Sequence, residues 1–341
     1  MMSEETKNEN VTSTASPTVQ EPTYHRKYGS RTSALEVVKD VDLTGKTILI
    51  TGTTAGIGTE TARTLALRGA HVVMANRNIV LSEQLRDNIY KETDKRTIDI
   101  LHMDLSSLQS VQAAVKEFLS KGWPLHVLIL NAGVLGSTTK NTIDGYETTF
   151  GINHLGHFYL TYLLLEKLRE SAPSRIVVVS SNSHNHSGIP LTATTDAKLA
   201  RLIPDPNTRE IAYKLYAYSK LCNVLFAFKL HREENKNGIN TYVLHPGSMI
   251  ATSISRSYGI LSKISNAIFK PFTKTIQQGA ATSVYCAASP DVEKDSGKYY
   301  ESCWDDEKSL SKLLAHDEAL QDALWEKSVE LVKKYEESRQ G

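Results

Sequence analysis

A tyrosine and a lysine stand four residues apart in the segment YAYSK, at Tyr216 and Lys220. Residues at this spacing lie on one face of a helix and can interact. An ordinary phenol, with a pKa near 10, is roughly 4 kcal/mol from deprotonation at neutral pH, and a neighbouring ammonium lowers that cost. The pair therefore indicates acid–base chemistry at Tyr216, although such pairs also occur on ordinary surface helices.

Two more polar side chains favour the chemical interpretation. Ser181 stands at the end of an expected strand over 175–180, where its hydroxyl can hydrogen-bond a substrate carbonyl. Asn153 is expected to begin a helix, where its amide can bind water and connect the lysine to solvent; the alternative is an ordinary helix cap. With a hydride carrier beside these residues, the tyrosine can exchange a proton with a substrate oxygen while hydride moves.

A glycine-rich segment, TGTTAGIG at residues 51–58, offers a place for such a carrier. It follows an expected strand and leads into a helix, so the backbone can approach a pyrophosphate and the helix N–H groups can bind it. The expected cofactor contacts in this segment are Gly52, Thr54, Gly56, Ile57 and Gly58. The spacing is GxxxGxG and not GxGxxG, and a purely structural turn is the alternative.

The end of the second expected strand separates the two nicotinamide cofactors. NAD sites usually place an acidic residue about 20 residues after the glycines, where it holds the ribose 2′-hydroxyl. This chain has Asn76-Arg77 instead, and the forked guanidinium of Arg77 suits a 2′-phosphate. NADP(H) is therefore favoured and NAD(H) is the alternative. Arg77 can also be read as a solvated charge at the end of a strand.

Two further segments follow the third and fourth expected strands. Asp104-Leu105 offers a carboxylate that can accept from the adenine amino group, and Asn131-Ala132-Gly133 offers small residues that let the backbone pass close to a cofactor. Either segment could be only a turn. Because ligands of open α/β sheets bind at the C-terminal ends of the strands, we expect both to line the cofactor site.

The scaffold that must bring these residues together can be predicted from the patterning after Lys46. Short β-rich runs alternate with longer amphipathic stretches, which predicts a parallel sheet covered by helices on both faces. We expect an α/β fold, a Rossmann-type doubly wound parallel sheet in a single domain over 41–341, after a flexible tail over 1–40 with some order around 24–38. The strands are expected at 47–51, 71–75, 98–102, 126–130, 175–180, 240–244 and 298–300, and helices at 58–67, 111–119, 158–168 and 318–335.

These motifs fall in the order and spacing of the short-chain dehydrogenase/reductase family, which the chain resembles from about residue 43 to its end. The resemblance rests on 51–58, 131–133, Asn153, Ser181, Tyr216 with Lys220, and Pro246-Gly247. It implies an Asn-Ser-Tyr-Lys tetrad, cofactor contacts by Tyr216 and by Lys220, which also holds the nicotinamide ribose, and a Pro246-Gly247 backbone beside the nicotinamide. It also implies a homodimer built on the helices near Asn153 and Tyr216.

The chain departs from the family pattern in places. Thr54-Ala55 replaces the usual Asn-Ser of the glycine loop, and the segment 248–252 is one residue longer than usual, which puts a role for Thr252 in doubt. Within the family, segments 153–160, 219–223, 271–274 and 277–281 resemble WW domain-containing oxidoreductases and, next, retinol dehydrogenases. No tryptophan precedes Trp123, so binding of Pro-rich ligands through a WW domain is not expected.

Apolar segments flank the expected reaction site. The insertion between Ser181 and Tyr216 contains apolar residues at 189–191 and 202–204, and such a loop can wall one side of a pocket. The stretch 249–272 mixes apolar residues with three basic ones and is expected to form lid helices. An apolar lid favours a lipophilic alcohol or carbonyl as the substrate, and the resemblance implies a retinoid- or steroid-like substrate. The lid could also touch a membrane surface, with core packing as the alternative.

Net charge, cysteine content and hydropathy narrow the classes of partner, cell compartment and metal site that the chain could have. A net charge of +1 gives no sign of a nucleic-acid partner. Three cysteines without CxxC spacing, a polar N-terminus and the absence of an apolar run of about 20 residues favour a reduced, cytoplasmic protein. His184 and His186 have no carboxylate or cysteine at a matching distance, so we expect a solvated loop there and no metal site.

The leading hypothesis is an NADP(H)-dependent dehydrogenase or reductase of a lipophilic small molecule. Tyr216 would be the general acid/base, and Lys220 would lower its pKa. Ser181 would orient the carbonyl, and Asn153 would anchor a proton relay. The rival hypothesis is a cofactor-binding regulatory or scaffold protein with little turnover. The tyrosine–lysine pair counts against the rival, because a scaffold has no physical need for it.

Overall fold

Seven parallel strands form the centre of the protein. The computed structural model describes residues 27–247, 274–305 and 307–339. The strands are β1 (Thr47–Thr51), β2 (His71–Asn76), β3 (Ile98–His102), β4 (Val127–Leu130), β5 (Ser174–Val179), β6 (Ile239–His245) and β7 (Lys298–Glu301). Their order, β3-β2-β1-β4-β5-β6-β7, runs outward from β1 and β4 in both directions. This order confirms the predicted doubly wound sheet.

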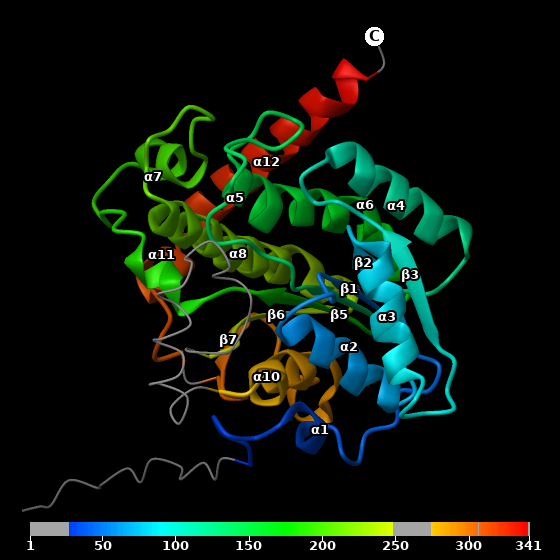
Figure 1. The fold of residues 1–341 in the computed structure, drawn as a ribbon. Helices are drawn as coiled ribbons and strands as arrows, with labels where there is room; N and C mark the ends of the chain where they lie inside the picture. The colour runs from blue at the N-terminus through cyan, green and yellow to red at the C-terminus, as the bar shows by residue number, and fades with distance from the viewer. Residues whose placement is uncertain (1–26, 248–273, 306, 340–341) are drawn as a thin grey trace, which may run out of the picture.

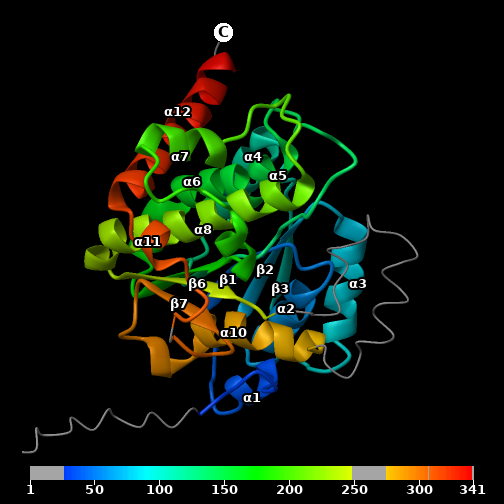
Figure 2. The ribbon, with the colours of Figure 1, turned by 90° about the vertical axis from the view of Figure 1, so that its left-hand side faces the viewer.

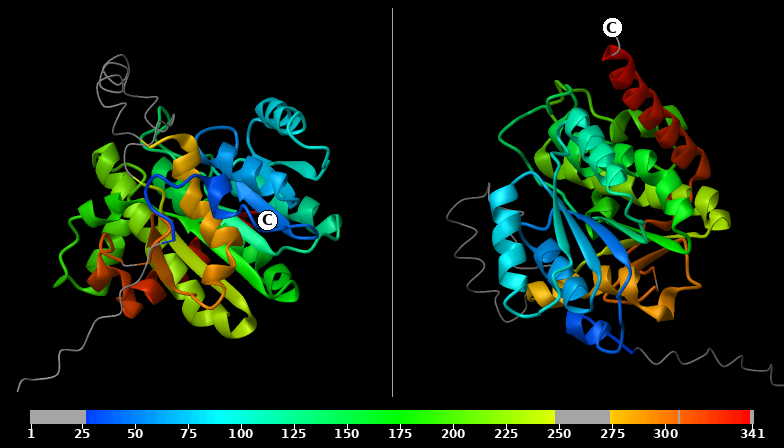
Figure 3. Two further views of the ribbon diagram at one scale, coloured as in Figure 1. Left: turned by 90° about the horizontal axis from the view of Figure 1, so that it is seen from below. Right: turned by 90° about the vertical axis from the view of Figure 1, so that its right-hand side faces the viewer.

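Helices cover the two faces of the sheet in separate layers (Figures 1 and 3). One layer contains α1 (Ala34–Val37), α2 (Ile57–Leu67), α3 (Ile79–Ile89) and α10 (Ile276–Ala288). The other contains α4 (Leu108–Ser120), α6 (Gly156–Glu170), α8 (Ala212–Glu234) and α12 (Glu318–Ser338). The short helices α5 (Thr148–Phe150), α7 (Thr195–Leu202) and α11 (Lys312–Ala315) lie on the side of α8, as Figure 2 shows.

The strands are apolar along their whole length because both of their faces are buried. In β1, Leu49 packs into the core under α6 and α8, whereas Ile48 and Ile50 pack into the core under α2 and α10. Successive side chains of a strand point to opposite faces, so one strand supplies both cores. Each of the seven predicted strands is present, with its ends within one residue of the prediction.

The ordered domain includes residues before the predicted boundary at 41. The helix α1 lies within 24–38, where some order was expected, and it packs against α10 and α2. Its residues Ala34 and Val37 are buried, and Ser33 and Glu36 form a capping box at its start. Residues 1–26 of the predicted tail lie outside the described residues.

The helix that carries Asn153 begins earlier than predicted. The helix α5, a π-helical turn over Gly151–Leu155 and α6 follow one another without a break. Glu147 caps the start by accepting from the backbone N–H groups of Thr149 and Phe150. Asn153 therefore lies inside the helix and does not begin it, which corrects the prediction. Single π-helical turns within α-helices are frequent at functional sites.

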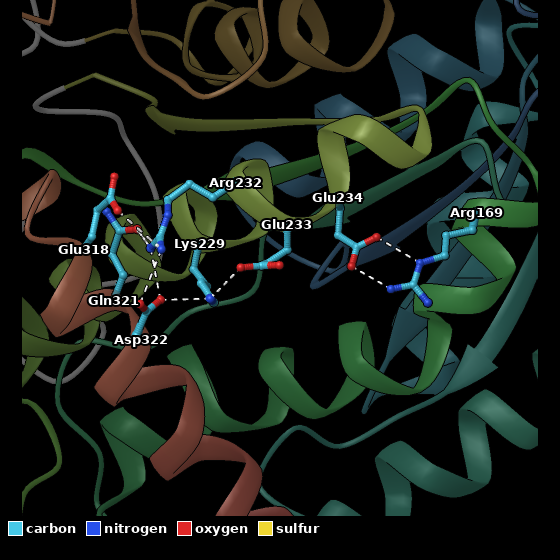
Figure 4. Close-up of polar contacts among 8 residues, drawn as sticks. All are labelled: Arg169, Lys229, Arg232, Glu233, Glu234, Glu318, Gln321 and Asp322. Carbon is cyan, nitrogen blue, oxygen red and sulfur yellow. Dashed lines mark hydrogen bonds and ion pairs between the residues drawn. The ribbon is translucent and has the colours of Figure 1, made fainter.

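The C-terminal helix α12 is attached along α8. Trp325 of α12 packs edge to face on Phe158 of α6, with ring centres 5.0 Å apart. Lys229 and Arg232 of α8 both pair with Asp322 of α12, at 2.8 Å and 3.0 Å (Figure 4). Because α12 covers the side of α8 that faces away from the sheet, α8 is buried around most of its circumference.

Candidate active site

The predicted site residues lie at the edge of the sheet where the parallel strands end. The residues that follow the strands are Gly52 after β1, Arg77 after β2, Asp104 after β3, Asn131 after β4, Ser181 after β5 and Pro246 after β6. Near Gly133, two residues from helices also lie at this edge of the sheet. A Cβ added to Gly133 would lie 3.3 Å from Lys220 Nζ and 3.4 Å from Asn153 Oδ1. The turn after β4, the π-helical turn and α8 therefore meet at one place.

Helix α8 places Tyr216 and Lys220 on one face. The Lys220 ammonium nitrogen lies 5.6 Å from the centre of the Tyr216 ring, and both residues are buried. Lys220 Nζ donates to the carbonyl oxygen of Val179 at 3.0 Å. The hydroxyl of Ser180 donates to the carbonyl oxygen of Lys220 at 2.8 Å. Two hydrogen bonds thus join the end of β5 to the part of α8 that carries the pair.

Burial moves the proton affinities of the two groups in opposite directions. It raises the pKa of Tyr216 to about 12, and a hydrogen bond with Ser181 offsets only part of this rise. It lowers the pKa of Lys220 to about 8. The protein environment by itself therefore does not lower the tyrosine pKa. The lowering expected from the sequence needs further positive charge, such as that of an oxidised nicotinamide.

The rate of carbonyl reduction is expected to fall as the pH rises through about 8. Below its pKa, Lys220 keeps an ammonium charge beside Tyr216, and above it the charge is lost. A profile of kcat against pH at saturating substrates measures this decline. Lys220→Arg keeps its charge at all these pH values and should move the decline to higher pH. A wild-type profile that stays level across this pKa would contradict the role of the charge.

Ser181 is positioned by a turn of 3₁₀ helix over Asn182–His186. The Ser181 hydroxyl accepts from the backbone N–H of Ser183 at 3.1 Å. His184 is fully buried, with Nδ1 2.6 Å from the carbonyl oxygen of Ser181 and Nε2 accepting from the N–H of Ser311 at 3.1 Å. The solvated loop expected for His184 is therefore wrong, because this side chain holds the backbone of Ser181.

The side chain of Asn153 connects a loop to a helix. Its Oδ1 accepts from the N–H of Val134 at 2.8 Å, and its Nδ2 donates to the Val134 carbonyl at 3.0 Å and to the Ser219 hydroxyl at 2.9 Å. Ser219 donates in turn to the carbonyl oxygen of Tyr216 at 2.8 Å. Asn153 thus positions the turn after β4 against α8, while its expected water relay stays a prediction.

The glycine loop has the shape of an anion cradle. Gly52 and Gly56 have φ angles of 72° and 62°, which favour glycine. A Cβ on Gly52 would lie 2.8 Å from the Cα of Ala132, so the two backbones pass in direct contact. Gly56 precedes α2 and offers no capping side chain, so the first N–H groups of α2 remain for a ligand. The loop therefore fits the pyrophosphate of a dinucleotide.

Gly58→Ala is expected to destabilise the protein by roughly 1–3 kcal/mol and to weaken dinucleotide binding. The new methyl group would lie 2.2 Å from the carbonyl oxygen of Gly52, so α2 must move away from the loop. Urea unfolding and fluorescence titration with NADPH measure the two effects. Gly29→Ala is the matched control, because nothing lies within 4 Å of its added Cβ. Similar results for both variants would rule out tight packing at Gly58.

Asn76 and Arg77 have different environments at the end of β2. Asn76 is buried, accepts from the N–H of Thr53 at 2.7 Å, and donates to the hydroxyls of Thr53 at 2.7 Å and Ser82 at 2.9 Å. It therefore ties the glycine loop to α3. The Arg77 side chain is exposed and forms no hydrogen bond or ion pair with the part of the chain that the structure describes.

The turn after β3 is held internally. Asp104 is half-buried, and its Oδ1 accepts from the N–H of Ser106 at 2.9 Å and from its hydroxyl at 2.8 Å. The carbonyl oxygen of Leu105 would lie 2.6 Å from a Cβ on Gly156, so this turn packs directly on α6. Contact of Asp104 with an adenine ring stays a prediction.

Pro246 and Gly247 end β6 beside a lysine from the start of α10. A Cβ on Gly247 would lie 2.4 Å from Nζ of Lys274. Lys274 donates to the Ser302 hydroxyl at 3.2 Å, and burial lowers its pKa. The predicted lid over 249–272, together with Thr252, lies outside the described residues. Its lid role and its membrane contact therefore stay predictions.

The insertion before Tyr216 contributes to the core, and a small cavity lies beside α8. Ile189 and Leu202 of the insertion before Tyr216 are buried in the core, whereas Leu191 of the same insertion is exposed. The pocket wall expected from this insertion stays a prediction. A cavity of about 220 Å³ lies beside the first turn of α8. It is lined by Gly136, Ser137, Thr138, Thr139, Lys140, Glu147, Thr149, Thr208, Glu210, Ala212 and Leu215. Hydroxyl and charged side chains thus make up most of this wall.

Two residues that the sequence analysis did not assign to the site are part of its framework. The Thr51 hydroxyl accepts from the backbone N–H groups of Asn131 and Ala132 at 2.9 Å and 3.0 Å. It also lies 2.8 Å from His157 Nε2. The available signals were the position of Thr51 at the end of the first strand and the spacing of His157, one helical turn after Asn153.

The described ranges contain few features of other kinds of site. No group of three His, Cys, Asp or Glu side chains there could hold a metal ion. None of the helices within these ranges is long and apolar enough to span a bilayer. Cys222, Cys286 and Cys303 are buried free thiols.

Comparison with known proteins identifies the family. Residues 46–200 match the family model described as short chain dehydrogenase. The WW domain-containing oxidoreductase of Gallus gallus is 41% identical over 313 residues, which cover 92% of this chain and 74% of that protein. Human retinol dehydrogenase 12 is 39% identical over 293 residues, 86% of this chain and 88% of that protein.

A solved structure agrees with the fold. It is a putative NAD(P)-dependent gluconate 5-dehydrogenase from Beutenbergia cavernae with bound NADP, which superposes with a TM-score of 0.59. The match covers 76% of this chain and 95% of that one at 19% sequence identity. At this level of identity the likeness concerns the fold alone.

Proposed function

This chain belongs to the short-chain dehydrogenase/reductase family of oxidoreductases, and on that premise we propose that it interconverts an alcohol and a carbonyl on a lipophilic substrate, with NADP(H) preferred. One observation carries the proposal. Lys220 and Asn153 meet at Gly133, within 3.3 Å and 3.4 Å of its added Cβ, at the sheet edge that also carries the glycine cradle. The Tyr216–Lys220 pair, which would handle the proton, therefore lies beside a glycine loop that fits a dinucleotide.

The residues of this chain would bind the cofactor and handle the proton. The loop from Gly52 to Gly58 would hold the pyrophosphate, and the bound nicotinamide supplies or accepts the hydride. Tyr216 donates its hydroxyl proton to the substrate oxygen during reduction and takes a proton back during oxidation. Ser181 donates a hydrogen bond to the same oxygen and orients it. The Lys220 ammonium stabilises the phenolate that remains.

The preference for NADP(H) rests on the two residues after β2. Asn76 is buried and its hydrogen bonds are used to hold the glycine loop, whereas the exposed guanidinium of Arg77 can bind a 2′-phosphate. No carboxylate stands at either position to bind a ribose 2′-hydroxyl.

Arg77→Ala is expected to raise the KM for NADPH about 10- to 100-fold, as the loss of a charge-assisted hydrogen bond would. The KM for NADH should stay the same, because NADH has no 2′-phosphate. Initial rates with each cofactor measure the ratio. Arg86→Ala is the matched control, because Arg86 pairs with Asp87 on the surface of α3. An equal rise in KM for NADPH and for NADH would show that Arg77 does not recognise the 2′-phosphate.

A lipophilic alcohol or carbonyl, retinoid- or steroid-like, is the substrate class that we propose. Retinol dehydrogenase 12 is 39% identical to this chain, and residues 249–272 are rich in apolar side chains. The polar cavity beside Leu215 suggests that a polar part of the substrate is accommodated near the start of α8.

The test is NADPH oxidation with a panel of lipophilic aldehydes and ketones that includes retinal. Turnover of an apolar carbonyl, with little turnover of short polar ones, is the expected result. Tight NADPH binding without turnover of any member would favour the rival role as a cofactor-binding scaffold. Turnover confined to short polar carbonyls would overturn the substrate class while leaving the reaction type in place.

We also propose a homodimer, which the family resemblance implies for the long helices α6 and α8. Because α12 lies along α8, a dimer of this kind would include α12 in its interface. Light scattering after size-exclusion chromatography should give twice the chain mass of 37.8 kDa. A single-chain mass at all concentrations would contradict the dimer.

A further inference from the structure

A buried imidazole links the cofactor loop to Asn153. His157 lies on α6 and is 2% exposed. Its Nε2 lies 2.8 Å from the hydroxyl oxygen of Thr51, the last residue of β1. Its Nδ1 lies 3.2 Å from the carbonyl oxygen of Asn153. One ring thus contacts both the strand that begins the glycine loop and the backbone of a tetrad residue.

The surrounding hydrogen bonds determine where the ring carries its proton. The Thr51 hydroxyl oxygen already accepts two N–H groups, from Asn131 and Ala132. A hydroxyl oxygen has two lone pairs, so its own hydrogen must point to His157 Nε2, which then accepts. The Asn153 carbonyl can only accept, so Nδ1 carries the hydrogen. The geometry therefore selects one neutral tautomer.

Other observations agree with a neutral ring. Burial, with a smaller contribution from the nearby Lys220 ammonium, lowers the pKa of His157 to about 4, although the hydrogen bond to the Asn153 carbonyl opposes this shift. A protonated ring would place a second N–H against a hydroxyl that has no free lone pair. His157 therefore keeps the same hydrogen bonds throughout the neutral pH range.

The hydrogen bonds continue from His157 to the catalytic tyrosine. The Asn153 side chain donates to Ser219, and Ser219 donates to the Tyr216 carbonyl. We propose that His157, protonated at Nδ1, is a positioning residue that couples the glycine-loop edge of the sheet to the Asn153–Tyr216 side of the reaction centre. The inference rests on the proposed function, because it assigns His157 a part in that same site.

Three variants of the full chain test this coupling. His157→Phe keeps an aromatic ring and removes both hydrogen bonds, Thr51→Val removes the hydroxyl, and Thr51→Ser keeps it. The matched control is Ser328→Ala, which removes the hydroxyl partner of another buried histidine, His154, at 3.1 Å on the side of α12. For each variant the NADPH dissociation constant, kcat at saturating NADPH, and the melting temperature are measured.

His157→Phe and Thr51→Val are each expected to weaken NADPH binding and lower kcat by roughly tenfold, the size of a lost buried hydrogen bond. The double variant, His157→Phe with Thr51→Val, should lose no more than Thr51→Val alone, since both changes break the same link. Thr51→Val can lose more than His157→Phe, because it also removes the acceptor of the Asn131 and Ala132 N–H groups. Thr51→Ser should restore wild-type values. Ser328→Ala should lower only the melting temperature.

Two results would overturn the inference. One is wild-type NADPH affinity and kcat in a folded His157→Phe; if that variant does not fold, the same result in Thr51→Val decides. The other is a double variant whose losses are the product of the two single losses. If the wild type turns over no carbonyl, the proposed function fails. The NADPH affinities of the single variants, the double variant and the control still decide whether His157 couples the two sides.

Discussion

Lys220→Met is expected to lower kcat by about 100-fold or more, the range for impaired acid–base catalysis. The ammonium of Lys220 lies 5.6 Å from the Tyr216 ring centre, and methionine has a similar length but no charge. The phenolate that forms during reduction then lacks its nearest cation. Steady-state kinetics at saturating cofactor and carbonyl measure the loss.

The same substitution is expected to increase the stability of the fold at neutral pH. Burial lowers the pKa of Lys220 to about 8 from 10.5, so the charged form is disfavoured in the folded state. That cost is fully present below about 8 and disappears as the pH rises to the unfolded value. The methionine variant should be on the order of 1–3 kcal/mol more stable at pH 7, a gain reduced by the missing hydrogen bond to Val179. The difference in the free energy of unfolding between the variant and the wild type, measured by urea unfolding, should disappear at high pH.

Lys229→Met is the control for both effects. Lys229 lies on the same helix but pairs with Glu233 and Asp322, away from the sheet edge. Its removal should reduce stability and leave kcat unchanged. A wild-type rate in Lys220→Met would end the assignment of Lys220, and equal losses of rate in both variants would indicate damage to α8 as a whole.

Tyr216→Phe removes the proposed proton donor and should lower kcat by about 10²–10⁴-fold, the usual contribution of a positioned acid or base. The ring stays in place, and the variant has no phenol oxygen to hydrogen-bond Ser181. NADPH binding should therefore keep its wild-type affinity. Rates with NADPH and an active carbonyl, compared with an NADPH titration, separate the two quantities.

The control is Tyr218→Phe, because Tyr218 is a buried phenol two residues along the same helix. It packs in the core near α7 and should keep the wild-type kcat. Turnover by Tyr216→Phe at the wild-type rate would show that another group transfers the proton. Loss of NADPH binding in that variant would show that the phenol serves the cofactor and not the substrate.

The fold was accessible from the sequence because its signals are local. Buried parallel strands read as short apolar runs, as in β1 and β4, and each predicted strand lies within one residue of its place. The pairing of Tyr216 with Lys220 was equally accessible, since a spacing of four residues determines a shared helix face. Helix ends were less accurate. The helix through Asn153 begins at Thr148 because Glu147 caps it, and glutamate is not among the residues that usually signal a helix start.

The roles of several polar residues could not be derived from the chain alone. His184 lies among polar residues in the sequence, yet it is buried and accepts a hydrogen bond from the backbone of Ser311, which is far away along the chain. Asn76 and Arg77 are adjacent, and only packing shows that the first holds the glycine loop and the second is exposed. Ile189 and Leu191 are two residues apart in the insertion before Tyr216, and only packing shows that the first lies in the core and the second is exposed.

The alternation of strands and helices, the order of the motifs and the acid–base pair on α8 follow from the sequence without further information. They depend on periodicity and spacing within short segments, which the contiguous chain contains in full. Which buried polar groups meet is settled only by the folded molecule. Thr51 and His157 are 106 residues apart and share a hydrogen bond, and Asn153 joins two elements through Val134 and Ser219. A buried polar group must find a partner, but which partner it finds depends on the packing of the whole sheet and its helices.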